Sequence, residues 1–239
     1  EKIVELIKQH FMKTSSLMLK DKTVLITAGP TREKIDPVRF ITNHSTGKMG
    51  YALAEAAKKE GARVVLISGP VHISPPTGVE IVRVESADDM YHAVMNNCDS
   101  ADIIIKTAAV ADYTPKVSFE HKMKKQPGDK VIQLERTKDI LFELGTMKRN
   151  KILVGFAAET ENVEEYALKK LTAKNADMIV ANNVKSEGAG FGMDTNIVTV
   201  YKRDGNKLEL PLMSKQDVAH KIIEEIAALP RDLEPNENC

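Results

Sequence analysis

The sequence predicts an α/β protein with a Rossmann-like, doubly wound, mainly parallel sheet and an antiparallel hairpin appendage. First, short apolar segments alternate with amphipathic ones as far as about residue 183, which is typical of βαβ units with right-handed crossovers. Second, residues 102–110 form a nearly continuous apolar run, as expected of a strand buried on both faces of a parallel sheet. Third, Asp204-Gly205 separates two strand-like segments and predicts a hairpin turn.

Each element follows from a local pattern. Strands are expected at residues 22–29, 62–69, 80–85, 102–110, 151–158, 177–182, 196–203 and 207–212, with an extended segment at 131–135. Helices are expected at residues 48–59, from 86 onward, and at 138–148, 162–175 and 214–229. Gly61 ends the first of these helices, and Pro230 stops the last. Ser86 caps the second, with Asp88 and Asp89 in its first turn.

The composition excludes several classes of protein. The 239 residues carry 34 basic and 34 acidic side chains, and this net charge of zero argues against a nucleic-acid binder. Two cysteines allow no disulfide framework or zinc spacing, and no apolar run approaches the length of a membrane span, so we expect a cytoplasmic protein. We expect a linker or lead-in helix at 1–19, one domain at 20–229 and a flexible tail at 230–239. Residue 1 is Glu, which suggests a piece of a longer protein.

A loop of some eighteen residues, following the first strand, is the first candidate site. It is longer than a strand-to-helix crossover needs, and it is rich in hydrogen-bonding groups. The dinucleotide fingerprint is absent, and Pro30 removes a backbone donor where a pyrophosphate would need one. A P-loop is excluded because Met49 stands where Ser or Thr must be, and Thr42 where Gly must be. What remains is a helix N-terminus at Thr46 to Lys48 that can bind an anion. Ser45 and Thr46 are expected to cap this helix, which does not exclude anion binding.

Ligands of such sheets bind at the carboxyl ends of the strands, and lysines gather in the loops expected there. Lys122, Lys124 and Lys125 follow Asp112 in the loop at residues 111–130; they are either a solvated charge run or a phosphate-binding cluster. Lys170 and Lys174 share one helix face, which is either a surface stripe or a phosphate contact. Phe156 is either core or a ring that stacks on a base, and Cys98 is expected to be a buried, inert thiol. These patterns predict an enzyme that binds a phosphorylated ligand through lysines.

Four motifs then indicate a family. Residues 28–50 (AGPTREKIDPVRFITNHSTGKMG), 106–115 (KTAAVADYTP), 121–125 (HKMKK) and 155–175 (GFAAETENVEEYALKKLTAKN) resemble phosphopantothenoylcysteine synthetase, in particular its bacterial form. That form is the carboxyl-terminal half of a bifunctional coenzyme A biosynthesis protein whose other half is a flavin-dependent decarboxylase. The resemblance implies that 4′-phosphopantothenate is joined to L-cysteine. CTP would activate the acid as an acyl-cytidylate, with Mg²⁺ assisting and with loss of pyrophosphate and then CMP.

The resemblance also implies roles for particular residues. Asn43 would hold the acyl-cytidylate carbonyl and Lys122 the triphosphate, and both are expected to be catalytic. The implied nucleotide-binding residues are Lys106, Thr107, Ala108, Asp112, Lys122, Lys138, Asp139, Ile140, Leu141, Phe156, Lys170 and Lys174. The implied acyl-substrate residues are Asn43, Ser45, Thr46, Gly47 and Lys48. Thr137-Lys138-Asp139 stands where the family has Asn-Pro-Asp, and no metal ligand is assigned. Residues 43–49 are expected to help form a homodimer. The alternatives are a nicotinamide-dependent oxidoreductase and a noncatalytic module of the same fold.

Overall fold

The computed structural model describes residues 17–125, 127–159, 161–183 and 190–230. Residues 1–16 of the predicted linker and residues 231–239 of the predicted tail lie outside this described part, as do residues 126, 160 and 184–189. Leu19 is fully buried, and its N–H donates to the Glu60 carbonyl at 3.0 Å. The packed domain therefore includes residues slightly before the expected start at 20.

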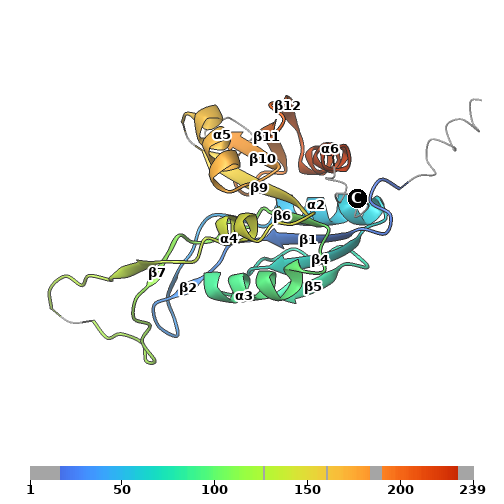
Figure 1. Ribbon diagram of the computed structural model, residues 1–239. Coiled ribbons are helices and arrows are strands. Elements are labelled where there is room, and N and C mark those ends of the chain that lie inside the picture. Colours follow the sequence, from blue (N-terminus) through green and yellow to red (C-terminus); the bar gives the residue numbers. More distant parts are fainter. Residues whose placement is uncertain (1–16, 126, 160, 184–189, 231–239) are drawn as a thin grey trace, which may run out of the picture.

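An eight-stranded, mainly parallel sheet forms the centre of the fold. Its strands are β1 (Thr23–Ala28), β4 (Arg63–Ser68), β5 (Glu80–Arg83), β6 (Ile103–Lys106), β9 (Ile152–Glu159), β10 (Met178–Asn183), β11 (Thr195–Lys202) and β12 (Lys207–Ser214). Their order is β12-β11-β10-β9-β6-β1-β4-β5 (Figure 1). The strands from β10 to β5 are parallel, whereas β11 and β12 are antiparallel. The predicted fold class is confirmed, and the hairpin extends the main sheet at its edge.

Helices cover both faces of this sheet. On one face lie α2 (Lys48–Lys59) and α6 (Lys215–Ala227), and on the other α3 (Ala87–Cys98), α4 (Ile140–Thr146) and α5 (Val163–Ala173). Alternate residues of each strand enter the two cores, as Val24 and Ile26 face α2 and α6 while Leu25 faces α3. Burial of both strand faces explains why the strands read as continuous apolar runs.

Local signals for the helices act largely as predicted. Ser86 and Asp89 form a reciprocal capping box at the start of α3, and Gly61 adopts a φ of 86° just after α2. Cys98 is buried at the end of α3, as predicted, and burial raises the pKa of its thiol, which disfavours the reactive thiolate. Among the described helices, none is both long and apolar enough to cross a membrane.

Two small antiparallel sheets were not predicted, although one of their strands, β8 (Leu134–Arg136), overlaps the extended segment expected at 131–135. In the long loop after β1, β2 (Glu33–Lys34) pairs with β3 (Phe40–Ile41), and farther along the chain β7 (Tyr113–Pro115) pairs with β8. These strands contact each other and, with their loops, project beyond the sheet as an arm (Figure 1). The long loop is therefore partly strand. Predicted strand 102–110 is also shortened, because β6 ends at Lys106 and the chain then turns along the sheet edge.

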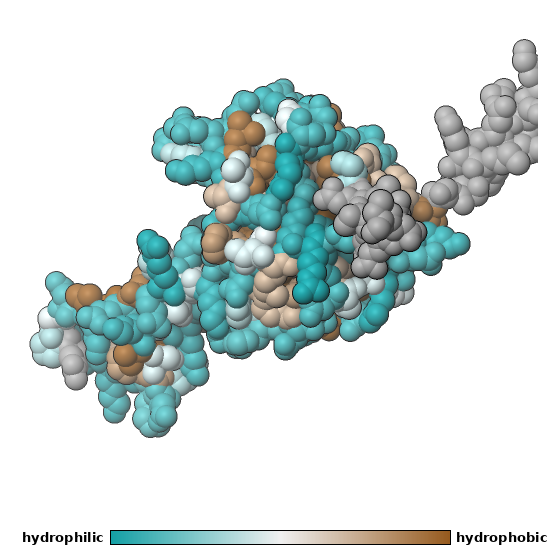
Figure 2. Space-filling model, in the orientation of Figure 1, coloured by the Kyte–Doolittle hydropathy of each residue, from teal (hydrophilic) through white to brown (hydrophobic). Residues whose placement is uncertain are grey.

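The arm carries much of the apolar surface seen in Figure 2, where brown side chains show at its far end. Its large exposed apolar residues are Val38, Phe40, Tyr113, Val117, Phe119, Val131, Ile132 and Leu134. Val131 alone is 85% exposed. A concentration of this kind on a projecting element is typical of a protein–protein contact.

Candidate functional site

A cleft of about 680 Å³ lies at the carboxyl ends of β1, β6, β9 and β10. This is the edge at which ligands bind in parallel α/β sheets. Fifteen of the seventeen predicted site residues line it, namely Ser45, Thr46, Gly47, Lys48, Lys106, Thr107, Ala108, Asp112, Lys138, Asp139, Ile140, Leu141, Phe156, Lys170 and Lys174. The topology thus brings together residues from five separate segments of the chain.

One end of the cleft is a cluster of lysines and acids. Burial, reinforced by the nearby Lys170 ammonium, lowers the pKa of Lys106 to about 8. Burial also lowers the pKa of Lys170, whose ammonium donates to the Phe156 carbonyl at 2.8 Å. Burial opposes ionisation of Asp139, but hydrogen bonds from Lys174 (2.8 Å) and from the Phe142 N–H (2.9 Å) outweigh it and lower its pKa. These cations can neutralise the phosphates of a nucleotide.

The floor of the cleft is built from small residues whose backbone groups are already paired. The Ala108 N–H donates to the Thr27 hydroxyl at 3.1 Å, and the Ala109 N–H donates to the Gly29 carbonyl at 3.0 Å. A Cβ on Gly50 would lie 2.5 Å from the Cβ of Ala28, so glycine is needed for α2 to approach β1 this closely. The small residues let a ligand approach the backbone.

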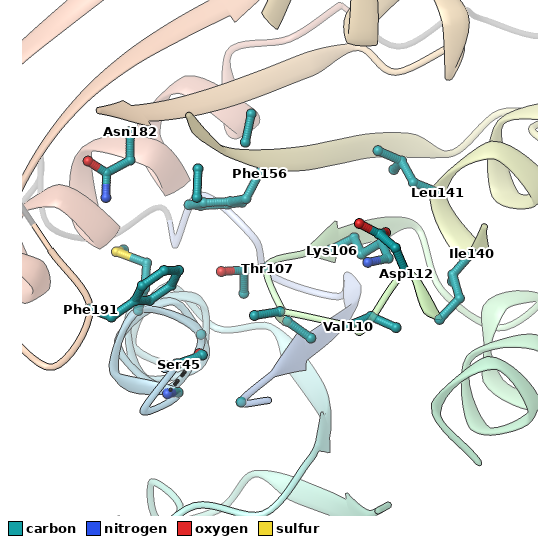
Figure 3. A pocket seen from close by; sticks show the side chains of 18 of the residues that line it. Ser45, Lys106, Thr107, Val110, Asp112, Ile140, Leu141, Phe156, Asn182 and Phe191 are labelled. Atoms are coloured by element: carbon teal, nitrogen blue, oxygen red, sulfur yellow. Dashed lines mark hydrogen bonds between the residues drawn. The ribbon is translucent and has the colours of Figure 1, made fainter. Parts of the chain in front are cut away.

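The other end of the cleft lies at the start of α2. Gly47 is the N-cap with a φ of 78°, and no side chain caps the helix, so the capping expected of Ser45 and Thr46 is not seen. The Lys48 ammonium donates to the Gly192 carbonyl at 2.7 Å and pairs with the Asp194 carboxylate at 2.7 Å. Figure 3 shows Phe156 and Thr107 between the two ends, with Ser45, Asn182 and Phe191 on one side and Lys106, Asp112 and Ile140 on the other.

Asn43 and Lys122, the two residues expected to be catalytic, do not line the cleft. The Asn43 amide donates to the Ala109 carbonyl, and its oxygen accepts from the Ser45 N–H at 3.0 Å, so the side chain joins two loops beside the cleft. Lys122 is exposed on the arm between β7 and β8. Its neighbour Met123 is held there by hydrogen bonds to the β2–β3 hairpin. Their predicted roles remain predictions.

Several lining residues were missed by sequence reasoning. They are Tyr113, Arg136, Asn182, Phe191, Asn196 and Lys215. Asn182 lies at the carboxyl end of β10, so the edge argument could have found it. Phe191 lies between Gly190 and Gly192, and Lys215 is the first residue of α6. Neither position carries a local signal, because both reach the cleft only through tertiary packing.

Comparisons with known proteins identify relatives along nearly the whole chain. Residues 19–229 match the family described as DNA/pantothenate metabolism flavoprotein C-terminal domain. The chain is 62% identical over 232 residues to the coenzyme A biosynthesis bifunctional protein CoaBC of Bacillus subtilis, covering 97% of this chain and 57% of that protein. The protein of the same name from Vibrio vulnificus (strain YJ016) is 47% identical over 230 residues, covering 95% of this chain and 56% of that protein. The chain therefore spans about half the length of these relatives.

Among solved structures, one similar chain is described as the C-terminal domain of coenzyme A biosynthesis bifunctional protein CoaBC. It is 55% identical, with a TM-score of 0.77, and the match covers 89% of this chain and 97% of that one. The similarity therefore extends from sequence to three-dimensional structure over most of the chain.

Proposed function

The chain belongs to the family of DNA/pantothenate metabolism flavoprotein C-terminal domains, and we propose that it joins 4′-phosphopantothenate to L-cysteine in coenzyme A biosynthesis, using CTP. The observation that carries this proposal is the gathering of fifteen residues implied by the family resemblance around one cleft. Relatives named as bifunctional coenzyme A biosynthesis proteins support the same reaction.

The reaction would proceed in two steps within the cleft. The carboxylate of the acid attacks the α-phosphorus of CTP, which releases pyrophosphate and leaves an acyl-cytidylate. The amine of cysteine then attacks the acyl carbon, an amide bond forms, CMP leaves and the amine loses a proton. The protein's contribution is to orient the reactants and to balance the phosphate charge, for which Lys106, Lys170 and Lys174 are suitably placed.

Magnesium would accompany the nucleotide. Among the described residues, no three His, Cys, Asp or Glu side chains gather in a way that could hold a metal ion by themselves. Asp112 and Asp139 line the cleft and offer carboxylate oxygens, the ligand type that Mg²⁺ prefers. These residues fit an ion bound mainly through phosphate oxygens, where it would offset negative charge on the triphosphate.

The alternatives rest on weaker support. A nicotinamide-dependent oxidoreductase would bind its pyrophosphate at the turn after β1, but there Pro30 lacks an N–H and forms an isolated bridge with Ala109. A noncatalytic module would keep the cleft without the chemistry. The closeness of Lys106 to a second partly buried lysine, Lys170, favours a site that binds phosphate.

A homodimer completes the proposal. The apolar side chains of the arm need a partner surface, and a second copy of this chain supplies the same surface in return. Pairing of two arms would also offer Lys122 a place in the partner's cleft, since it does not reach its own. We further propose a cytoplasmic protein in which a flavin-dependent decarboxylase half precedes this domain, as the bifunctional names of its relatives suggest.

The test is an assay of two products with each substrate omitted in turn. Pyrophosphate should appear only with CTP, 4′-phosphopantothenate and Mg²⁺ all present, and CMP should accumulate only when cysteine is added. ATP in place of CTP tests nucleotide preference, and oxidation of NADH or NADPH tests the oxidoreductase alternative. Absence of both pyrophosphate and CMP in the complete mixture would exclude the ligase reaction.

A further inference from the structure

A second pair of lysines meets at the end of the cleft away from Lys106. Lys48 lies in the first turn of α2, and Lys215 is the first residue of α6 and only 7% exposed. Both ammonium groups donate to the segment before β11, Lys48 to the Gly192 carbonyl at 2.7 Å and Lys215 to the Met193 carbonyl. Two helix starts thus direct their cations at one short stretch of chain.

The charges at this point are not balanced. Among the described residues, Lys215 forms no ion pair, although it is almost fully buried. The two ammonium groups lie near each other, because they donate to the carbonyls of adjacent residues, Gly192 and Met193. Burial first, and then the charge of Lys48, lower the pKa of Lys215. In the part of the chain that the structure describes, the carboxylate paired with Lys48 is that of Asp194, at 2.7 Å, and this hydrogen bond lowers the pKa of Asp194. A buried cation beside a second cation needs an anion.

The Asp194 carboxylate supplies a negative charge at Lys48, but few contacts fix its position. Its side chain is 88% exposed, so it can rotate into solvent without any movement of the backbone. A second hollow of about 640 Å³ adjoins the cleft here, and Lys48 and Lys215 line both cavities. An incoming anion therefore has room to reach both ammonium groups. No side chain caps the N-terminus of α2, and the first N–H groups of a helix have no partner within the helix, so they add donors beside the two ammonium groups.

We propose that Lys48 and Lys215 bind the phosphate group of the acid substrate, and that the Asp194 carboxylate occupies this place at Lys48 until the phosphate displaces it. The inference rests on the proposed function and extends it, because it assigns a role to Lys215 and Asp194. A reaction between two phosphorylated molecules needs two separate anion sites with the reacting carboxylate between them. Lys106 and Lys170 supply one at their end of the cleft, and Lys48 and Lys215 supply the other.

The test compares Michaelis constants of the two phosphorylated substrates. In Lys215→Met and in Lys48→Met, the KM for 4′-phosphopantothenate should rise about 10- to 100-fold, as expected for loss of a charge-assisted hydrogen bond, while the KM for CTP stays at the wild-type value. Lys221→Met removes an exposed lysine from the same helix α6 and serves as the matched control, with neither constant changed. Lys48 is partly exposed, so its variant decides the question if Lys215→Met fails to fold.

Results that contradict the phosphate-binding role can be distinguished from a protein that does not catalyse the reaction at all. A rise in the KM for CTP would assign these lysines to the nucleotide triphosphate instead, and unchanged constants would remove them from binding altogether. Asp194→Asn should lower the KM for 4′-phosphopantothenate severalfold because the competing charge is gone, and an unchanged or higher KM would overturn the role of Asp194. If the wild-type protein releases no pyrophosphate, the proposed function fails first.

Discussion

The carboxylate of Asp36 accepts a hydrogen bond from the backbone N–H of Met123 at 3.2 Å, across 87 residues of sequence. Hydrogen bonds from the Arg39 side chain hold the pKa of Asp36 well below its usual range, although burial opposes its charge. The contact ties the loop that bears Lys122 to the β2–β3 hairpin. Because the folded-state pKa is depressed, this link is fully present above about pH 4 and is lost only in stronger acid.

Replacement of Asp36 should therefore free the loop that bears Lys122 from the β2–β3 hairpin. Asp36→Asn keeps the shape of the side chain but removes the charge that pairs with Arg39. We expect trypsin to cleave after Lys122, Lys124 or Lys125 about tenfold faster than in the wild type, since cleavage follows the population of the opened loop. Asp129→Asn, an exposed change in the same loop, is the matched control. Equal cleavage rates in all three proteins would show that Asp36 does not restrain the loop.

Lys106 makes nucleotide binding depend on pH. Its pKa of about 8 means that its ammonium is charged at pH 7 and largely neutral at pH 9. The affinity for CTP should consequently fall about tenfold between these values, as one charge-assisted contact to phosphate is lost. Lys106→Arg keeps the charge throughout and should abolish the decline when binding is measured by calorimetry. A wild-type affinity that does not vary over this range would exclude Lys106 from phosphate binding.

The same residue should affect stability with a defined sign. Since its pKa in the folded protein lies below the 10.5 of a free lysine, the unfolded chain binds more protons between about pH 8 and 10.5. The free energy of unfolding should therefore rise with pH in this window, and urea titrations of Lys106→Met should lack that rise.

The arm is expected to hold two copies of the chain together. Val131→Glu places a charge on the most exposed apolar side chain of the arm and should shift the protein from dimer to monomer at micromolar concentration. Leu212→Glu is the matched control, because Leu212 is 53% exposed on the edge strand β12, away from the arm (Figure 1). Analytical ultracentrifugation distinguishes the two forms. A wild-type monomer, or an unaltered dimer in Val131→Glu, would contradict the proposed interface.

A helix or strand could be predicted from the sequence when the contacts that stabilise it are local. The helix predicted at 48–59 coincides with α2 (Lys48–Lys59), because its apolar spacing and Gly61 are signals within one segment. The pairs β2–β3 and β7–β8 were missed because each strand has two or three residues and little burial. Their support comes from distant contacts such as that of Asp36 with Met123, which no local pattern shows.

The residues of the cleft likewise differ in whether their positions could be predicted from the sequence. Lys106 and Phe156 reach the cleft because they end or occupy parallel strands, and topology alone brings such residues to one edge. Lys215 could not be predicted, because its place beside Lys48 depends on α6 packing against α2, although the two helices begin more than 160 residues apart. Lys122 shows the converse, since a motif in a carboxyl-end loop need not face the cleft of its own chain.

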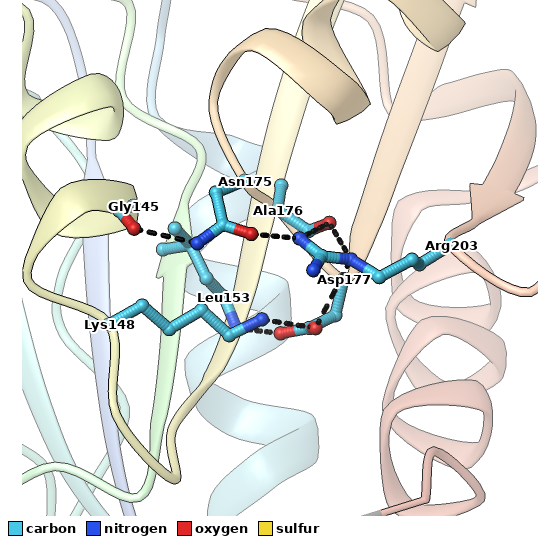
Figure 4. A network of polar contacts seen from close by, with 7 residues as sticks. All are labelled: Gly145, Lys148, Leu153, Asn175, Ala176, Asp177 and Arg203. Atoms are coloured by element: carbon cyan, nitrogen blue, oxygen red, sulfur yellow. Dashed lines mark hydrogen bonds and ion pairs between the residues drawn. The ribbon is translucent and has the colours of Figure 1, made fainter.

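At the amino ends of β9 and β10, away from the cleft, a polar network should contribute substantially to stability. Figure 4 shows the Asp177 carboxylate between Lys148 and the backbone N–H of Leu153, with Arg203 close by. Asp177→Ala should lower the free energy of unfolding by roughly 3 kcal/mol, because it leaves a partly buried ammonium unpaired. Lys59→Met breaks an exposed pair with Glu55 and should change stability by less than about 1 kcal/mol in the same urea titration. If Asp177→Ala lowered the free energy of unfolding no more than Lys59→Met does, the network would add little to stability.

The two steps of the proposed reaction should separate at Asn43. Its amide nitrogen donates to the Ala109 carbonyl and its oxygen accepts from the Ser45 N–H. Asp in its place keeps the acceptor but sets a negative oxygen against that carbonyl and removes the donor expected to hold the acyl group. We expect a pyrophosphate burst in Asn43→Asp, followed by CMP release about 100-fold slower than in the wild type. Thr42→Val, which removes only a neighbouring hydrogen bond to the Thr31 carbonyl, should retain both rates within a few-fold. Equal loss of burst and release in Asn43→Asp would mean that Asn43 shapes the loop rather than the acyl intermediate.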